Sequence, residues 1–298
     1  MDWVGVDLDN LSLNESLQFD EVQTFAEHMI AHQVLKDESV LPALSQLQLF
    51  LGATVLGKAR LGSTVGQRLL AAMVMMYHGL SMHDSITEGR TTHEKRRQLT
   101  ILGGDYLSSL FYRLLADAGL LDMVKIFAKA IVQINEAKMS LHDARLNGTY
   151  SEANYLKDLS TIHGALLHAL CDTYAPIERI RTLVDLAIAA SIYDKEVERV
   201  SHAGKTSLAN VLLATFASED ERPFLLMQPR SEVCDKRLTS LHMKYGTTKR
   251  IFHSFREVMV QLEDIAIDVI GSEGWGMLRI FFQHANNGAD HVPSVEGG

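Results

Sequence analysis

Residues 96–115 read RRQLTILGGDYLSSLFYRLL, and their spacing indicates what kind of fold the chain adopts. Between Leu99 and Leu115 the spacing predicts a helix with apolar side chains on almost every side, and Leu69–Met82 has the same character. Helices that are apolar all round are buried between other helices. We therefore expect these two segments to form the centre of an all-α helical bundle.

The flanking sequence adds amphipathic helices. The segments Asp122–His142 and Ile251–Ile270 each repeat apolar residues at intervals of three and four, and Gly271 is predicted to end the second helix. The Asn-Gly pair in Arg145–Tyr150 predicts a turn, and Pro176 predicts the start of another helix. We expect one all-α domain over residues 1–285 and a polar, glycine-rich tail over residues 286–298 that is disordered.

Composition excludes several classes of protein. The chain has 298 residues, of which 47% are hydrophobic, so it can bury a core. Its net charge of -9 argues against a general nucleic-acid binder. Two cysteines cannot form a disulfide framework, and the sequence MDWVGVDLDN lacks the features of a signal peptide, so we expect a cytoplasmic protein. No run reaches the roughly 18 apolar residues of a membrane span, which leaves only peripheral membrane contact.

Some motifs carry little chemistry. The sequence AGKTS at Ala203–Ser207 resembles the end of a phosphate-binding loop, but the first glycine of that loop would fall at Arg199 and no strand precedes it. His163, His168 and Cys171 can share one side of a helix, but a zinc site needs a fourth ligand that the sequence does not indicate. We interpret these residues as a loop or helix start and as core or surface side chains.

The segment HGLSMHDSITEG, His78–Gly89, has two interpretations. Ser85 and Glu88 fit a helix-capping box, in which Asp84 would lie near a helix N-terminus without binding a ligand. Alternatively, Asp84 and Glu88 belong to an acidic metal-binding motif from which one carboxylate is missing. The segment alone does not choose between them.

The neighbouring helix favours the second interpretation. RRQLTILGGDYLSSLFYRLL resembles the signature helix of trans-prenyl diphosphate synthases, which follows the first aspartate-rich motif of that family. In catalytic members the resemblance implies two DDxxD motifs that hold magnesium ions on the allylic diphosphate, because magnesium prefers hard oxygen ligands. Here the first motif reads His83 followed by DSITE. The second, ASIYDKEVERV at Ala190–Val200, has Lys195 where a ligand carboxylate is expected, and its ammonium would repel the ions.

The combination of two degenerate motifs with intact GGDYLSSLFYRLL and INEAKMSLH segments resembles component 1 of bacterial heptaprenyl diphosphate synthase. The match lies within Met75–Leu141. It implies an accessory subunit that is inactive alone and has no catalytic residue or metal of its own. Its partner would be a DDxxD-containing catalytic subunit that binds Mg²⁺ and elongates farnesyl diphosphate with isopentenyl diphosphate for the menaquinone side chain.

The resemblance also assigns residues. The degenerate metal-motif positions are His83, Asp84, Glu88, Asp194 and Glu198. Structural or partner-contacting roles fall to Asp105, Tyr106 and Lys138. We expect Asp105 to be buried, and a buried carboxylate needs a cation, which Arg96, Arg97 or Lys138 could supply.

A partner interface is expected to include part of Leu69–Leu80 or Leu99–Leu115. The methionine-rich Leu69–Leu80 suits either a core or a deformable wall against an isoprenoid chain. Two other functions remain open. One is a self-sufficient synthase that uses Asp84, Glu88, Asp105 and Asp194. The other is a helical regulator without prenyl chemistry.

Overall fold

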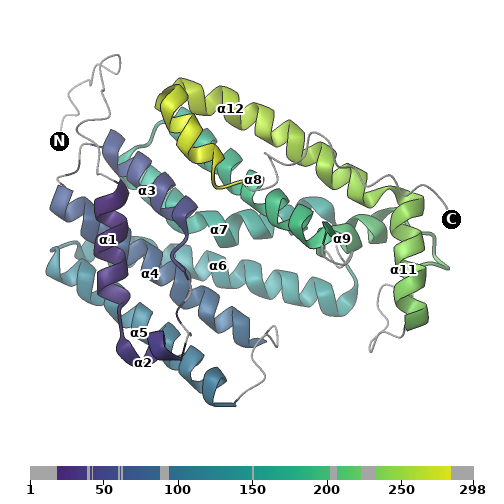
Figure 1. Cartoon of the computed structure of the whole chain (residues 1–298), viewed down its shortest axis with the longest axis horizontal. Helices are drawn as coiled ribbons and strands as arrows, with labels where there is room; N and C mark the ends of the chain where they lie inside the picture. The colour runs from purple at the N-terminus through teal and green to yellow at the C-terminus, as the bar shows by residue number, and fades with distance from the viewer. Residues whose placement is uncertain are drawn as a thin grey trace. The chain divides into compact units, whose positions relative to one another are not determined.

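A computed structural model describes residues 19–38, 41, 43–59, 61, 63–87, 94–149, 151–201, 207–222 and 232–282. All regular secondary structure in these ranges is helical, which confirms the predicted all-α class. The helices are α1 (Phe19–Ile30), α2 (Gln33–Asp37), α3 (Gln46–Lys58), α4 (Ser63–Thr87), α5 (Glu94–Asp117), α6 (Leu121–Asn147), α7 (Glu152–Tyr174), α8 (Glu178–Ser201), α9 (Ser207–Phe216), α11 (Glu232–Tyr245) and α12 (Thr247–Arg279) (Figure 1).

Contacts between residues divide the chain into two compact units. The first comprises Met1–Phe127 and Ala169–Pro176, and the second Ala128–His168 and Ile177–Gly298. A single domain over residues 1–285 therefore stays a prediction. The tail expected over residues 286–298 lies outside the described residues.

The first unit is built around α4. Helices α1, α3 and α5 all contact it, and α5 runs alongside it (Figure 1). From Leu69 to Met76 every side chain of α4 is at most 4% exposed, which confirms that this segment is a core helix. Glycines allow α4 and α5 to approach closely, because a Cβ atom on Gly104 would lie 3.2 Å from the carbonyl oxygen of Gly79.

Helix α5 departs from the prediction. Leu107, Leu110, Phe111, Leu114 and Leu115 are buried, but Ile101, Leu102 and Tyr112 are exposed. The expectation that α5 is buried on all sides is therefore wrong for one of its faces, because its neighbours cover the side that carries the two glycines and the leucines.

A buried histidine connects α4 to the start of α3. The backbone N–H of Ser45, the N-cap residue of α3, donates a hydrogen bond to Nε2 of His78 at 2.9 Å. Burial lowers the pKa of His78 to about 4. The imidazole is thus neutral near pH 7, and Nε2 can accept this hydrogen bond.

In the second unit, α12 packs along α8 (Figure 1). The helical backbone of α12 breaks at Gly271, where φ is 74°, and then continues to Arg279. This break confirms the helix end predicted at Gly271, and the second helical stretch beyond it was not predicted. The turn predicted near Asn147 is also present, with Gly148 at a φ of 64°.

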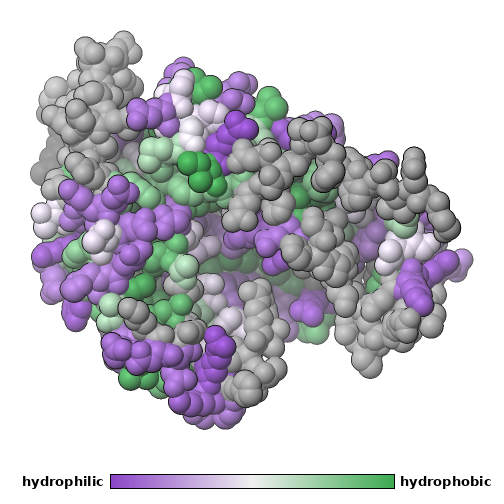
Figure 2. Space-filling view, in the orientation of Figure 1, coloured by the Kyte–Doolittle hydropathy of each residue, from purple (hydrophilic) through white to green (hydrophobic). Residues whose placement is uncertain are grey.

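Apolar side chains remain exposed on several helices. On the face drawn in Figure 2, hydrophobic residues are visible among hydrophilic ones. Among the described residues, each helix is too short or too polar to span a lipid bilayer.

Candidate functional site

The first degenerate motif lies in the last turns of α4. His83, Asp84 and Ser85 are all inside this helix, and Glu88 lies outside the described residues. The hydroxyl of Ser85 donates to the carbonyl oxygen of Met82 at 2.7 Å. The capping-box interpretation is therefore wrong, because a helix N-cap must precede its helix and Ser85 lies near the end of one.

His83 lies against α5 because the glycine beneath it has no side chain. A Cβ atom on Gly104 would lie 2.7 Å from Nε2 of His83. The same Nε2 is 3.5 Å from Oδ1 of Asp105. The Asp105 side chain is 65% exposed and that of His83 is 40% exposed, so water screens this pair.

The expected burial of Asp105 is therefore wrong. Gly103 and Gly104 are buried, and Asp105 lies one residue further around the helix, on the solvent side. Its ionic contact is with His83. Arg97, one of the cations considered as its partner, instead pairs with Glu94. A solvated carboxylate does not need a buried cation.

Two further residues complete this region. Asp84 is half-buried, and its charge adds to the effect of burial in raising the pKa of Tyr77 to about 12. Tyr106 is half-buried, and its ring meets the ring of His32 edge-on at 5.3 Å between centroids. Asp84 is thus the carboxylate that α4 presents at the first motif in the described residues.

The second degenerate motif lies near the end of α8 and has a different structure. Asp194 is half-buried, while Lys195 and Glu198 are exposed. Between them Glu196 is buried, with 1% of its surface exposed. Both oxygens of its carboxylate accept hydrogen bonds: Oε1 from Nη1 of Arg199 at 2.8 Å and from the Tyr155 hydroxyl at 3.5 Å, and Oε2 from the Leu208 backbone N–H at 3.1 Å.

Glu196 was missed by sequence reasoning, although a signal was available. It follows the buried residues Ile192 and Tyr193 by four and three positions, which places it on the same face of the helix. Its carboxylate satisfies a free N–H in the first turn of α9, where negative charge is favourable. Glu196 therefore joins α7, α8 and α9.

Positive charge gathers near this motif. Desolvation, together with the smaller effects of the charges of Lys195, Lys138 and Arg199, lowers the pKa of His163 on α7 to about 3. Lys138, predicted to be structural or partner-contacting, is half-buried on α6. No group of three or more His, Cys, Asp or Glu residues in the described part of the chain could hold a metal ion.

The other motifs can also be placed. His168, considered as a zinc ligand, has Nε2 2.6 Å from Oδ1 of Asp185. Of the AGKTS segment, residues 203–206 lie outside the described ranges, and Ser207 begins α9.

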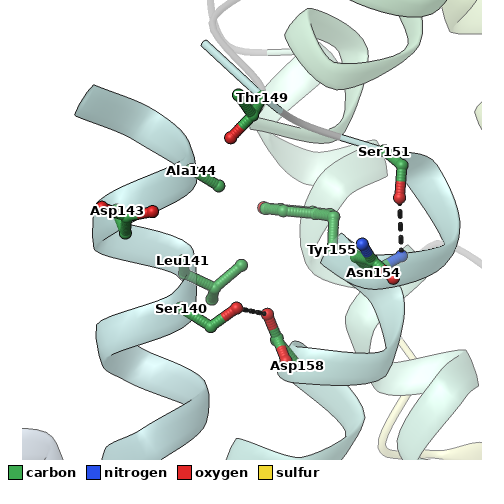
Figure 3. Close-up of a pocket in the computed structure, with 9 residues that line it drawn as sticks. All are labelled: Ser140, Leu141, Asp143, Ala144, Thr149, Ser151, Asn154, Tyr155 and Asp158. Atoms are coloured by element: carbon green, nitrogen blue, oxygen red, sulfur yellow. Dashed lines mark hydrogen bonds between the residues drawn. The ribbon is translucent and has the colours of Figure 1, made fainter. Parts of the chain in front are cut away.

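A small cavity lies between the second half of α6 and the start of α7. Its volume is about 160 Å³. Ser140 donates to Oδ2 of Asp158 at 2.7 Å across it, and the Tyr155 ring points into it (Figure 3). Its lining residues are Ser140, Leu141, Asp143, Ala144, Thr149, Ser151, Asn154, Tyr155 and Asp158. The two aspartates and the hydroxyl groups make part of the lining polar, and Leu141 and Ala144 make part of it apolar. This cavity was not predicted.

Solved structures identify the fold. The chain is similar to a heptaprenyl diphosphate synthase from Staphylococcus aureus, with a TM-score of 0.69 and 12% identity over 93% of this chain and 98% of that one. It is also similar to a decaprenyl diphosphate synthase from Rhodobacter capsulatus, with a TM-score of 0.65 and 18% identity over 91% and 95% of the two chains. The chain thus has the all-α fold of polyprenyl diphosphate synthases.

The sequence narrows this class to one family. Residues 32–236 match the family model for heptaprenyl diphosphate synthase subunit 1, and the chain belongs to that family. It is 35% identical over 109 residues to heptaprenyl diphosphate synthase component 1 from Geobacillus stearothermophilus. That match spans 37% of this chain and 48%, about half, of that relative. The resemblance found in the sequence is confirmed.

Proposed function

We propose that this chain is a non-catalytic subunit of a heptaprenyl-type diphosphate synthase in the cytoplasm. It assists a DDxxD-containing partner that elongates farnesyl diphosphate with isopentenyl diphosphate, and the product serves the menaquinone side chain. The observation that carries the proposal is the second motif, where Lys195 replaces a carboxylate and the neighbouring Glu196 is turned into the protein.

The donor groups do not fit a magnesium cluster. Both oxygens of Glu196 accept hydrogen bonds from protein groups, so this carboxylate is not available to a metal ion. The charges of Lys138, Lys195 and Arg199 act on His163 of α7 and would repel magnesium. In this proposal the partner holds the Mg²⁺, and the chain takes no catalytic step through a metal.

The name of the Geobacillus relative, component 1, supports the existence of a partner. Of the two interface segments considered from the sequence, Leu69–Leu80 has its first eight residues, Leu69–Met76, buried in the chain's own core, where they cannot contact another protein. On α5, Ile101, Leu102 and Tyr112 are exposed. We propose that the partner contacts this side of α5, next to Asp105.

The test is an activity assay of three samples: this chain, the DDxxD-containing synthase from the same organism, and their mixture. Each sample receives farnesyl diphosphate, isopentenyl diphosphate and magnesium. We expect long-chain product only from the mixture. Product from this chain alone would instead establish the self-sufficient synthase. If the activity of the DDxxD-containing synthase did not change when this chain was added, the helical regulator would be favoured.

A pair of variants locates the chemistry. Asp84→Asn in this chain should leave the rate of the mixture almost unchanged. Loss of a DDxxD aspartate in the partner should remove charge stabilisation of the transition state worth several kcal/mol.

Leu102→Asp should weaken the mixed complex, whereas Val260→Asp, at an exposed position on α12, is the matched control.

A further inference from the structure

The cavity between α6 and α7 takes no part in the proposed function. Its volume is about 160 Å³. An engineered protein cavity of about 150 Å³ holds benzene, so a molecule of roughly six non-hydrogen atoms fits a space of this size. Side chains from the last turns of α6 and the first turns of α7 line it, together with Thr149 and Ser151 between the two helices. The cavity is therefore large enough for a small organic molecule.

Two carboxylates line the cavity, and their hydrogen-bond donors are uncharged. Oδ1 of Asp143 accepts from Nδ2 of Asn147 at 2.9 Å. Oδ2 of Asp158 accepts from the hydroxyl of Ser140 at 2.7 Å. In the part of the chain that the structure describes, no lysine, arginine or histidine forms an ion pair with either aspartate. These residues therefore leave two negative charges at the cavity without a cation.

The two carboxylates lie at different levels of the cavity. Asp158 meets Ser140 across it, and Asp143 is three residues further along α6 (Figure 3). Three residues of an α-helix span about 4.5 Å along its axis, so Asp143 starts about that far from the level of the Ser140–Asp158 hydrogen bond. Leu141 and Ala144 add apolar surface to the same lining. The cavity thus combines two separated negative charges with an apolar wall.

An aromatic ring adds to this wall. Tyr155 is 7% exposed, and its ring points into the cavity (Figure 3). Its hydroxyl donates to Oε1 of Glu196 at 3.5 Å, which holds the ring from the side of α8. Aromatic rings attract ammonium groups, and a side chain that is already held in place loses little freedom when a ligand binds.

We propose that this cavity binds a short aliphatic diamine with both amino groups protonated. One ammonium group pairs with Asp143 and the other with Asp158. The methylene groups between them lie against Leu141, Ala144 and the tyrosine ring. A diamine such as 1,4-diaminobutane has about six non-hydrogen atoms, which suits the volume of the cavity.

Other classes of ligand suit this lining less well. Two carboxylates would repel an anion. A neutral molecule would leave both negative charges unpaired in a partly enclosed space. A hydrated metal ion would gain nothing from Leu141, Ala144 or the ring of Tyr155, whereas the methylene groups of a diamine contact such surfaces favourably.

Isothermal titration calorimetry of the full chain with 1,4-diaminobutane at neutral pH tests the proposal. We expect one saturable site, and no binding of 1,4-butanediol, which has a similar length and no charge. Asp143→Asn and Asp158→Asn should each weaken diamine binding by about tenfold or more, because each removes a charge-assisted hydrogen bond. Glu136→Gln, at an exposed position on α6 outside the cavity lining, removes the same charge and should leave the affinity unchanged.

A variant that keeps both carboxylates tests the cavity itself. Ala144→Leu places a larger side chain in the lining and should abolish diamine binding. Ala128→Leu, at an exposed position on α6 outside the lining, is the matched control and should bind like the wild type. Far-UV circular dichroism should be unchanged in each variant.

Any of four results overturns the proposal. Absence of diamine binding to the wild-type chain would show that the cavity does not take this ligand. Equal losses in Asp143→Asn and Glu136→Gln would show a general attraction of the diamine to a chain of net charge -9. Binding retained in Ala144→Leu would place the diamine elsewhere, and displacement of the diamine by equimolar magnesium would assign the carboxylates to a metal ion. The experiment uses this chain alone, so its outcome does not depend on the proposed function.

Discussion

The two degenerate acidic motifs lie in different surroundings. At the end of α4, His83 and Asp105 form a pair that water reaches, and Asp84 is half-buried beside Tyr77. At the end of α8, Glu196 is buried and joins three helices. At the first motif the acidic side chains make few contacts on which the fold depends. The second motif stabilises the fold, because its central carboxylate, Glu196, accepts hydrogen bonds from α7, α8 and α9.

The difference shows that the acidic residues of the two segments have unrelated structural roles. Asp84 and Glu196 are both carboxylates in motif segments, yet one is beside a tyrosine and the other caps a helix. Predictions about stability should therefore separate the two regions, with large effects at the second motif and small effects at the first.

The largest effect is expected at Glu196. Glu196→Ala removes a buried carboxylate and leaves Arg199 and the Leu208 N–H without this acceptor, which should lower the free energy of unfolding by about 4 kcal/mol. Denaturant unfolding followed by circular dichroism measures the change. Glu198→Ala, at an exposed position two residues away, is the control and should cost under about 1 kcal/mol. Equal losses at the two positions would remove the contrast between the motifs.

An intermediate effect is expected from the buried imidazole of α4. The folded state holds the pKa of His78 at about 4, against 6.5 ordinarily, so between these values the unfolded chain binds the proton more readily. Stability should be complete above pH 6.5 and should fall by about 3 kcal/mol as the pH drops to about 4. Thermal unfolding across this range measures the loss.

His78→Gln serves as the comparison for this pH dependence. Its side-chain oxygen can accept the Ser45 N–H and does not titrate, so the variant should lose less stability than the wild type between pH 6.5 and 4. Identical pH profiles would show that His78 does not carry the effect. His163→Gln should reduce the loss of stability that the wild type shows as the pH falls to about 3. Desolvation and nearby cations hold the pKa of His163 at about that value, so this residue resists protonation until then.

The smallest effect is expected at Asp105. The pair with His83 is solvent-exposed, so Asp105→Asn should change the free energy of unfolding by less than about 1 kcal/mol. Urea unfolding at neutral pH is sufficient to measure it. A loss as large as that predicted for Glu196 would mean that the first motif is as structural as the second.

Local patterns were enough to predict α4, α5, α6, the start of α8 and α12. The apolar runs in α4, the stripe of α6 and the break at Gly271 follow from residue spacing and glycine chemistry, which act within a few turns of the chain. The family followed from short segments such as GGDYLSSL and INEAK, which were recognised as a resemblance. These features need no knowledge of what packs against them.

Tertiary structure decided which polar residues are buried. Asp105 is exposed because α4 covers the glycine side of α5, and Glu196 is buried because Tyr155 and Leu208, 41 and 12 residues away, converge on it. Spacing within one helix says which residues share a face, but not which face a neighbouring helix will cover. The cost of burying a carboxylate depends on donors from other helices, and only the folded chain brings those donors together.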